Sequence, residues 1–155
     1  MNDRTYPDDV DCVWLASDRR SYLGAFATGG VGPIPLQALN CELVTLEEIE
    51  ELIYGLPKVS DARLLVSMKR PDDFISMAER GFFVYDWRDI HRTAQEATQT
   101  YEPIAVPHNP LRIDALPKRL ANVVEKIRFD NAVFIDGLAL DVQSQMECRR
   151  GAQRV

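Results

Sequence analysis

The residues best suited to acid–base or metal chemistry lie just after an aromatic stretch in the middle of the chain. They are Asp86, Asp89 and His91, which His108 and Asp136 could join in three dimensions. Carboxylates together with an imidazole can hold a divalent cation or transfer protons. Their spacing matches no established ligand motif, however, and the chain contains only two histidines. We favour the simpler interpretation, in which Asp86 ends a strand and His91 lies on a solvated surface.

Three other kinds of catalytic or ligand-binding motif are absent from the sequence. The glycine cluster 29–32 runs directly into the prolines of 33–35, whereas a phosphate-binding loop leads into a helix with free backbone amides. We therefore expect a structural turn there. The chain has no Gly-x-Ser-x-Gly elbow, and Cys12, Cys41 and Cys148 form no Cys-x-x-Cys pair. We predict no catalytic residue, no metal site and no cofactor, with reduced cysteines of which Cys12 and Cys41 lie in the core.

The densest group of charged residues is a row of glutamates with apolar residues between them. Its members are Glu47, Glu48, Glu50 and Glu51, and Glu42 lies nearby. Such a row is usually the solvated face of a helix. Its functional interpretation is a docking surface for a basic partner, because complementary charge steers association and sharpens specificity. We predict the four residues of the row as the partner-binding residues.

The bulk composition restricts the partners further. The 155 residues carry a net charge of −6, and 46% of them are hydrophobic, which suits one globular domain. Nucleic-acid binding depends on cations that neutralise phosphates, so an acidic chain without a basic stripe is a poor candidate for it. Residues 1–9 lack the basic segment and apolar run of a secretory signal, and no stretch is long enough to span a membrane. We expect a cytoplasmic protein that binds neither nucleic acids nor membranes.

The elements that must position these residues are predicted from hydrophobic spacing and from turn residues. Two apolar runs around a short polar break, 12–16 and 22–27, are typical of a β-hairpin. Thr45 followed by Glu48 is a capping-box pattern, and it begins a helix whose outward face carries the glutamate row. The remaining predicted elements are a strand over 62–68, a helix over 71–80, a strand over 82–87, a surface helix or loop over 89–100, an extended loop or edge strand over 101–117, a helix over 117–129 and a hairpin or bulged strand over 132–142.

This order of elements favours an α+β fold over a doubly wound sheet. We predict a single domain over 1–142, with a mixed, mainly antiparallel sheet that starts with the N-terminal hairpin and packs against about three helices. A frayed tail would follow over 143–155, where the apolar pattern is lost. Trp14, Tyr85 and Trp87 could anchor an interface, but at strand positions we expect them in the core.

The opening segment also carries a resemblance. The residues Val13-Trp14-Leu15-Ala16-Ser17-Asp18, Gly24-Ala25-Phe26 and Gly32-Pro33-Ile34-Pro35 make it similar to the start of small uncharacterised bacterial proteins. Some of those proteins resemble the immunity proteins encoded beside polymorphic or contact-dependent toxins. The resemblance covers about the first quarter of the chain. It implies a bacterial cytoplasmic protein that binds and blocks a toxin domain.

Three hypotheses follow for the function. The first is a non-catalytic binding protein, an immunity-type inhibitor whose acidic surface occludes a basic toxin domain. The second is a small metal-dependent enzyme that uses Asp86, Asp89 and His91. The third is a regulatory or structural subunit that forms homo-oligomers through an exposed sheet edge. The absence of catalytic motifs favours binding over catalysis.

Overall fold

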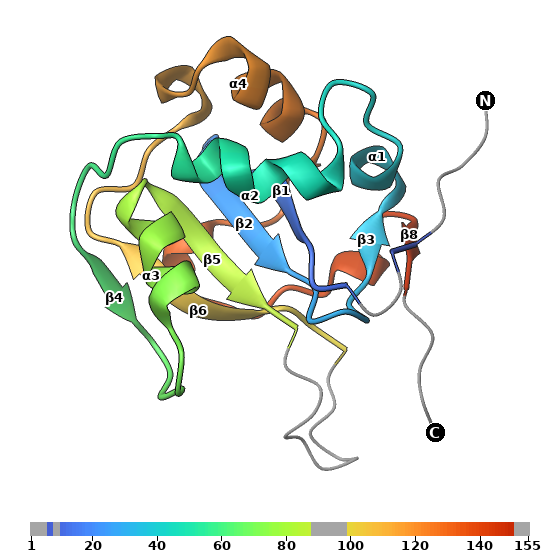
Figure 1. The fold of residues 1–155 in the computed structure, drawn as a ribbon. Helices are drawn as coiled ribbons and strands as arrows, with labels where there is room; N and C mark the ends of the chain where they lie inside the picture. The colour runs from blue at the N-terminus through green and yellow to red at the C-terminus, as the bar shows by residue number, and fades with distance from the viewer. Residues whose placement is uncertain (1–5, 8–9, 88–98, 151–155) are drawn as a thin grey trace.

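The computed structural model describes residues 6–7, 10–87 and 99–150. Within these residues, one mixed sheet occupies the centre of the molecule (Figure 1). Its strands are, in spatial order, β4 (Ala62–Leu64), β6 (Glu102–Pro107), β5 (Phe82–Asp86), β2 (Leu23–Ala27), β1 (Val13–Asp18) and β7 (Arg128–Phe129). The neighbours β1–β2, β5–β6 and β4–β6 are antiparallel, whereas β2–β5 and β1–β7 are parallel. The predicted α+β class and the N-terminal hairpin are therefore confirmed.

Helices cover one face of this sheet (Figure 1). They are α2 (Leu46–Tyr54), α3 (Asp72–Glu79) and α4 (Lys118–Glu125), and a short α1 (Leu36–Leu39) lies beside the sheet. Alternate strand residues such as Leu15, Ala25 and Val84 point toward the helices, where Ile53 and Val124 are also fully buried. Because side chains alternate along a strand, the intervening residues must be covered from the other side.

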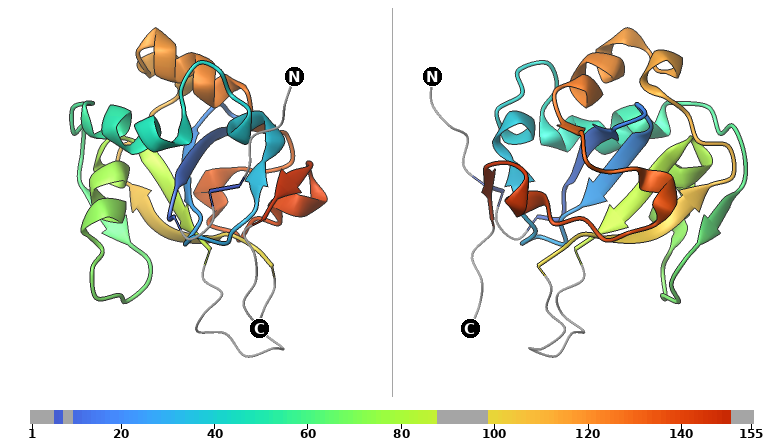
Figure 2. Two further views of the ribbon diagram at one scale, coloured as in Figure 1. Left: turned by 45° about the vertical axis from the view of Figure 1, so that its right-hand side comes forward. Right: turned by 180° about the vertical axis from the view of Figure 1, so that it is seen from behind.

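The second face is aromatic, and the C-terminal part of the chain covers it (Figure 2). Trp14 stacks on Phe26 with ring centroids 4.3 Å apart, and Phe26 stacks on Tyr85 at 4.7 Å. Phe134 packs against this stack, at 5.5 Å from Tyr85 and 6.0 Å from Phe26. The covering segment contains two 3₁₀ helices, η2 (Phe134–Asp136) and η3 (Val142–Ser144). Trp14, Tyr85 and Trp87 are all buried, so the expected core positions are correct.

Three expectations for the second half of the chain are wrong. Residues 132–142 form η2 followed by a left-handed Gly137, because they lie across the sheet instead of adding a hairpin to it. Within the described part of the predicted tail, residues 143–150 are not frayed, since β8 (Cys148–Arg149) pairs with β3 (Ile34–Pro35) in a second small sheet. Finally, β6 is an internal strand although it contains two prolines. Pro103 lies at an irregularity in the β5–β6 pairing and Pro107 at the last β4–β6 pair, where a missing N–H disturbs the ladder least.

Candidate protein-binding site

The glutamate row lies on α2, and its first turn is built as the sequence predicted. The Glu48 carboxylate accepts hydrogen bonds from the backbone N–H of Thr45 at 3.3 Å and from its hydroxyl at 2.9 Å, which completes a capping box. Glu48 also forms an ion pair with Arg119 of α4 at 3.1 Å. These partners lower the pKa of Glu48, the Thr45 hydroxyl contributing most. Glu48 therefore fixes the start of the helix, while Glu47 and Glu51 are exposed and have solvent around them.

Glu50 occupies a different position, in a small pocket between α2 and α3. The pocket holds about 210 Å³ and has an apolar floor that includes Val13, Ala27 and Met77. Its polar rim consists of Asp11, Glu50, Tyr54, Arg70 and Asp73. Three of these residues, Asp11, Glu50 and Asp73, are carboxylates. We call them, together with the other glutamates of the row on α2, the acidic face.

Three separate segments bring the pocket carboxylates together. Asp11 precedes β1 and accepts a hydrogen bond from the backbone N–H of Gly29 at 2.9 Å. The antiparallel register of the hairpin places Gly29 opposite Asp11. Glu50 lies one turn before Tyr54 on α2, and Asp73 lies in the first turn of α3. A carboxylate in a first helical turn is favoured by the helix dipole, so Asp73 stabilises α3 as well as adding to the acidic face.

The pocket concentrates negative charge that its own residues do not neutralise. Partial burial raises the pKa of Glu50, and the nearby carboxylates of Asp11 and Asp73 raise it further. Burial also raises the pKa of Asp11, against the lowering effect of the Gly29 hydrogen bond. Among the residues lining the pocket, Arg70 is the single cation, and it forms no ion pair within the described part of the chain. The arrangement therefore favours a cation supplied from outside.

Tyr54 adds an unsatisfied polar group to this rim. Its hydroxyl is hidden from solvent and makes no hydrogen bond of good geometry among the described residues, although the Asp73 carboxylate lies close enough to interact with it. Burial, together with the charges of Asp73 and Glu50, raises the pKa of Tyr54 to about 12. The hydroxyl is therefore a neutral donor at physiological pH.

Arg80 fixes the spacing of the two helices that form the pocket. Its guanidinium donates to the carbonyl oxygens of Leu56 at 2.9 Å and Tyr54 at 3.2 Å, and to Ser76 of α3. It also lies 5.6 Å from the centre of the Tyr54 ring. Because the last carbonyls of a helix have no partners within it, a cation at this position satisfies them and ties α2 to α3.

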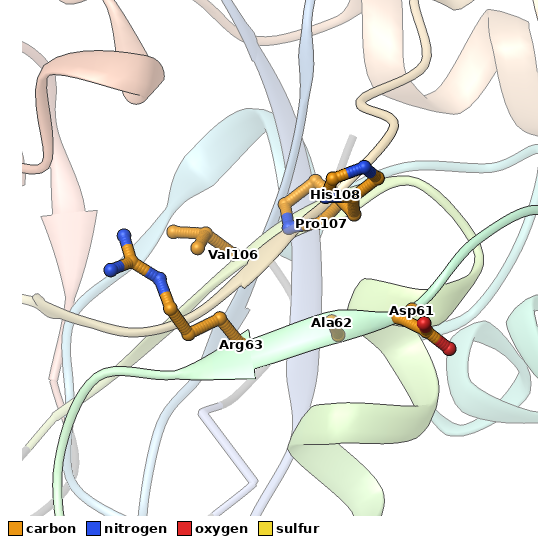
Figure 3. Close-up of a pocket in the computed structure, with 6 residues that line it drawn as sticks. All are labelled: Asp61, Ala62, Arg63, Val106, Pro107 and His108. Atoms are coloured by element: carbon orange, nitrogen blue, oxygen red, sulfur yellow. The ribbon is translucent and has the colours of Figure 1, made fainter.

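A second depression, of about 360 Å³, lies along β4 and β6 (Figure 3). Its charged or titratable residues are Asp61, Arg63 and His108, and Figure 3 shows Asp61 and Arg63 at its two ends. The backbone N–H of His108 donates to the carbonyl of Asp61 at 2.9 Å, but no ion pair or side-chain hydrogen bond is found between any two of these described residues. The side chains do not converge, so this depression is a weaker candidate than the acidic pocket.

The group considered for metal chemistry is only partly within the described residues. Asp89 and His91 lie outside them, so a role for these two stays a prediction. Asp86 ends β5 and pairs with Glu102, whereas His108 follows the far end of β6, about 20 Å away along the strand. Asp86 and His108 therefore cannot bind the same metal ion. Asp136 lies exposed in η2. Within the described part of the chain, no group of three or more potential ligands is close enough to hold a metal ion.

The glycine cluster and two of the cysteines are found where the sequence predicted them. The amides of Gly29, Gly30 and Gly32 donate to Asp11, to the Thr28 hydroxyl and to the Thr28 carbonyl, so they are used within the turn. Cys12 and Cys41 are buried and unpaired. Both features have structural roles in the hairpin and the helical face of the core.

Comparison with family models, with curated proteins and with solved structures gives no significant match for this chain. Among the residues that the structure describes, no helix combines the length and the apolar character needed to cross a lipid bilayer.

Sequence reasoning found the glutamate row but missed Asp11 and Asp73 as its neighbours. The hairpin register offered one signal, since an acidic residue just before the first strand lies opposite the glycine turn after the second. Nothing local indicated Asp73, because its approach depends on how α3 packs beside α2.

Proposed function

We propose that this protein binds a basic protein domain through the acidic face, as an immunity-type inhibitor binds and blocks a toxin domain. The observation that carries the proposal is the convergence of Asp11, Glu50 and Asp73 on one pocket, where the charges of Asp11 and Asp73 disfavour the ionisation of Glu50 and the charge of Asp73 disfavours that of Asp11. A guanidinium or ammonium group of a partner would relieve this repulsion. Complementary charge of this kind raises association rates and rejects partners of the wrong sign.

The size of the pocket favours a protein partner over a metabolite. Small-molecule sites usually hold about 300–1,000 Å³, and this pocket holds about 210 Å³. Such a volume suits one basic side chain inserted from a larger surface. The exposed Glu47 and Glu51 then extend the contact along α2. A buried anchor surrounded by a polar rim is the usual anatomy of a protein interface.

The experiment uses the product of the gene that neighbours this one, because immunity proteins are encoded beside their toxins. We expect a complex between the two purified proteins by calorimetry, with an affinity that falls as salt is raised. Glu47→Lys combined with Glu51→Lys should weaken the complex by at least about tenfold. The matched control, Asp61→Lys with Glu147→Lys, makes the same change of charge at exposed residues outside the acidic face and should retain binding.

Two outcomes would overturn the proposal. One is that the neighbouring product is a metabolic enzyme that does not bind this protein. The other is a complex that both double variants weaken equally, since this would assign the effect to net charge instead of to the acidic face. Binding that requires Glu50 or Asp73 but not Asp61 would support the pocket as the centre of the contact.

A further inference from the structure

A depression lined by arginines lies at the turn end of the β1–β2 hairpin. It holds about 660 Å³, within the range of small-molecule sites. Arg20 and Ser21 come from the hairpin turn, Arg112 from the segment before η1 (Ile113–Ala115) and Arg128 from β7. The acidic pocket includes Val13 and Ala27 at the opposite end of the same hairpin, so the two sites are separate.

The hairpin turn that carries Arg20 is rigidly held. Asp18 is fully buried, and its carboxylate accepts hydrogen bonds from the backbone N–H groups of Arg20 at 2.8 Å, Tyr22 at 3.0 Å and Phe134 at 2.8 Å. Ser21 adopts a left-handed conformation with φ of 67°, which is uncommon for a residue other than glycine. Its carbonyl accepts a hydrogen bond from Ile113, which joins the turn to the opposite wall of the depression. Such backbone strain is found most often at functional sites.

The guanidinium groups of Arg112 and Arg128 are held by contacts within the protein. Arg128 donates to the carbonyl oxygen of Arg19 at 2.7 Å and to the Asp130 carboxylate at 2.9 Å. Arg112 lies 4.9 Å from the centre of the Tyr22 ring, a distance typical of a cation–π contact. Holding the side chains in advance lowers the entropy that binding would otherwise cost.

The arginines retain capacity for an anion. Asp114 and Glu125 also line the depression, but among the described residues neither forms an ion pair with Arg20, Arg112 or Arg128. The guanidinium of Arg20 has no ion-pair partner within the described part of the chain. A guanidinium presents its N–H groups in a planar fork that matches a phosphate or carboxylate.

We propose that this depression binds a small molecule that carries a phosphate group. Arg20, Arg112 and Arg128 would hold the phosphate, and the apolar side chains of Leu116 and Ala121 would contact the organic part of the ligand. The acids on the rim would disfavour ligands that carry further negative charge away from the phosphate. The site is independent of the acidic face and goes beyond the proposed function.

The test is a titration of the full chain with small anions, in which the chemical shifts of the backbone amides report binding. The probes are phenyl phosphate, inorganic phosphate and benzoate, which separate the ester, the free anion and a carboxylate. We expect phenyl phosphate to bind at millimolar concentration or below, and to shift amides in the hairpin turn and around η1. Arg20→Gln and Arg112→Gln should each weaken it by about tenfold. Arg63→Gln, an exposed arginine on β4, is the matched control and should leave binding unchanged.

Each outcome decides the proposal. Absence of binding, unchanged binding by the double variant Arg20→Gln/Arg112→Gln, or tighter binding of benzoate than of both phosphates would overturn it. If inorganic phosphate binds as tightly as phenyl phosphate, the anion site is supported, but the proposed contact with the organic part of the ligand is wrong. An unchanged melting temperature of the variants shows that the loss is not caused by unfolding.

Discussion

Ionised Glu50 lowers the free energy of unfolding, and a role in partner binding would explain why a carboxylate occupies this position. Its pKa in the folded protein lies above the ordinary value of 4.5, so the folded chain holds this proton more tightly than the unfolded chain does. Ionisation of Glu50 therefore destabilises the protein. This loss of stability is absent below pH 4.5 and is fully present above the raised pKa of the folded protein.

Glu50→Gln should accordingly stabilise the protein at pH 7. We expect a gain below about 1 kcal/mol, because solvent screens a half-buried group, and no gain at a pH below 4.5. Urea unfolding at several pH values measures this difference. Glu51→Gln, on the exposed side of the same helix, is the control and should change stability by less than about 0.5 kcal/mol at any pH. A loss of stability in Glu50→Gln at pH 7 would contradict the electrostatic account of the pocket.

The thiol of Cys12 should be almost unreactive in the folded protein. Burial, with the charges of Glu47, Asp11 and Glu50, raises its pKa from 9.0 to about 11. The thiolate is the reactive form, so its population at pH 8 falls by about 100-fold. We expect iodoacetamide to modify Cys12 at least about 100-fold more slowly in the native protein than in urea, as measured by peptide mapping. Equal rates in the two states would show that the N-terminal side of the acidic face is open to solvent.

Arg80 is the residue on which the geometry of two elements depends. Arg80→Met keeps the apolar stem but leaves the carbonyls of Tyr54 and Leu56 without their charged donor. Hydrogen bonds to charged groups contribute roughly 1.5–3 kcal/mol, so we expect a loss of about 2 kcal/mol in the free energy of unfolding. Arg63→Met on β4 is the matched control, with an expected change below about 0.5 kcal/mol. Arg80→Met should also weaken partner binding, because α2 and α3 form the pocket together.

Elements determined by nearby residues were predicted well from the sequence. The hairpin and the capped α2 depend on contacts within a few residues of one another, such as the Thr45–Glu48 pair. The errors fall where distant segments decide the outcome. Asp136-Gly137 has the composition of a hairpin turn, but Phe134 packs on the aromatic face and draws the chain across the sheet. β6 lies inside the sheet because β4 pairs with its outer edge, which no local pattern reveals.

The candidate sites follow the same division. The glutamate row was visible because it lies on one helix, whereas Asp11 and Asp73 join it through tertiary packing. The arginines of the depression at the hairpin turn, Arg20, Arg112 and Arg128, are far apart in the sequence and were not recognised as a group. Charge spacing along the chain cannot report such clusters, since they depend on how β7 and the segment around η1 reach the hairpin turn.

At the scale of the whole molecule, the aromatic face depends on the segment that covers it. Phe134→Ala would remove a ring that is 1% exposed and contacts Phe26, Phe83 and Tyr85. We expect a loss of about 3–5 kcal/mol, measured by urea unfolding, with a weaker near-ultraviolet circular dichroism signal. Ile135→Ala, at the adjacent residue that is 55% exposed, should cost less than about 0.5 kcal/mol. Similar losses in the two variants would mean that the segment does not seal the core.

The arrangement of this cover has a consequence during synthesis. A ribosome delivers β1, β2 and β5 long before residues 134–142, so the nascent chain carries its stacked Trp14, Phe26 and Tyr85 without their lid. Unshielded aromatic surface of this kind attracts chaperones and favours aggregation. The helices α2 and α3 can pack on the sheet during translation, whereas the aromatic layer closes only when residues 134–142 have left the exit tunnel. Slowing translation would therefore prolong the vulnerable interval without helping the core to form.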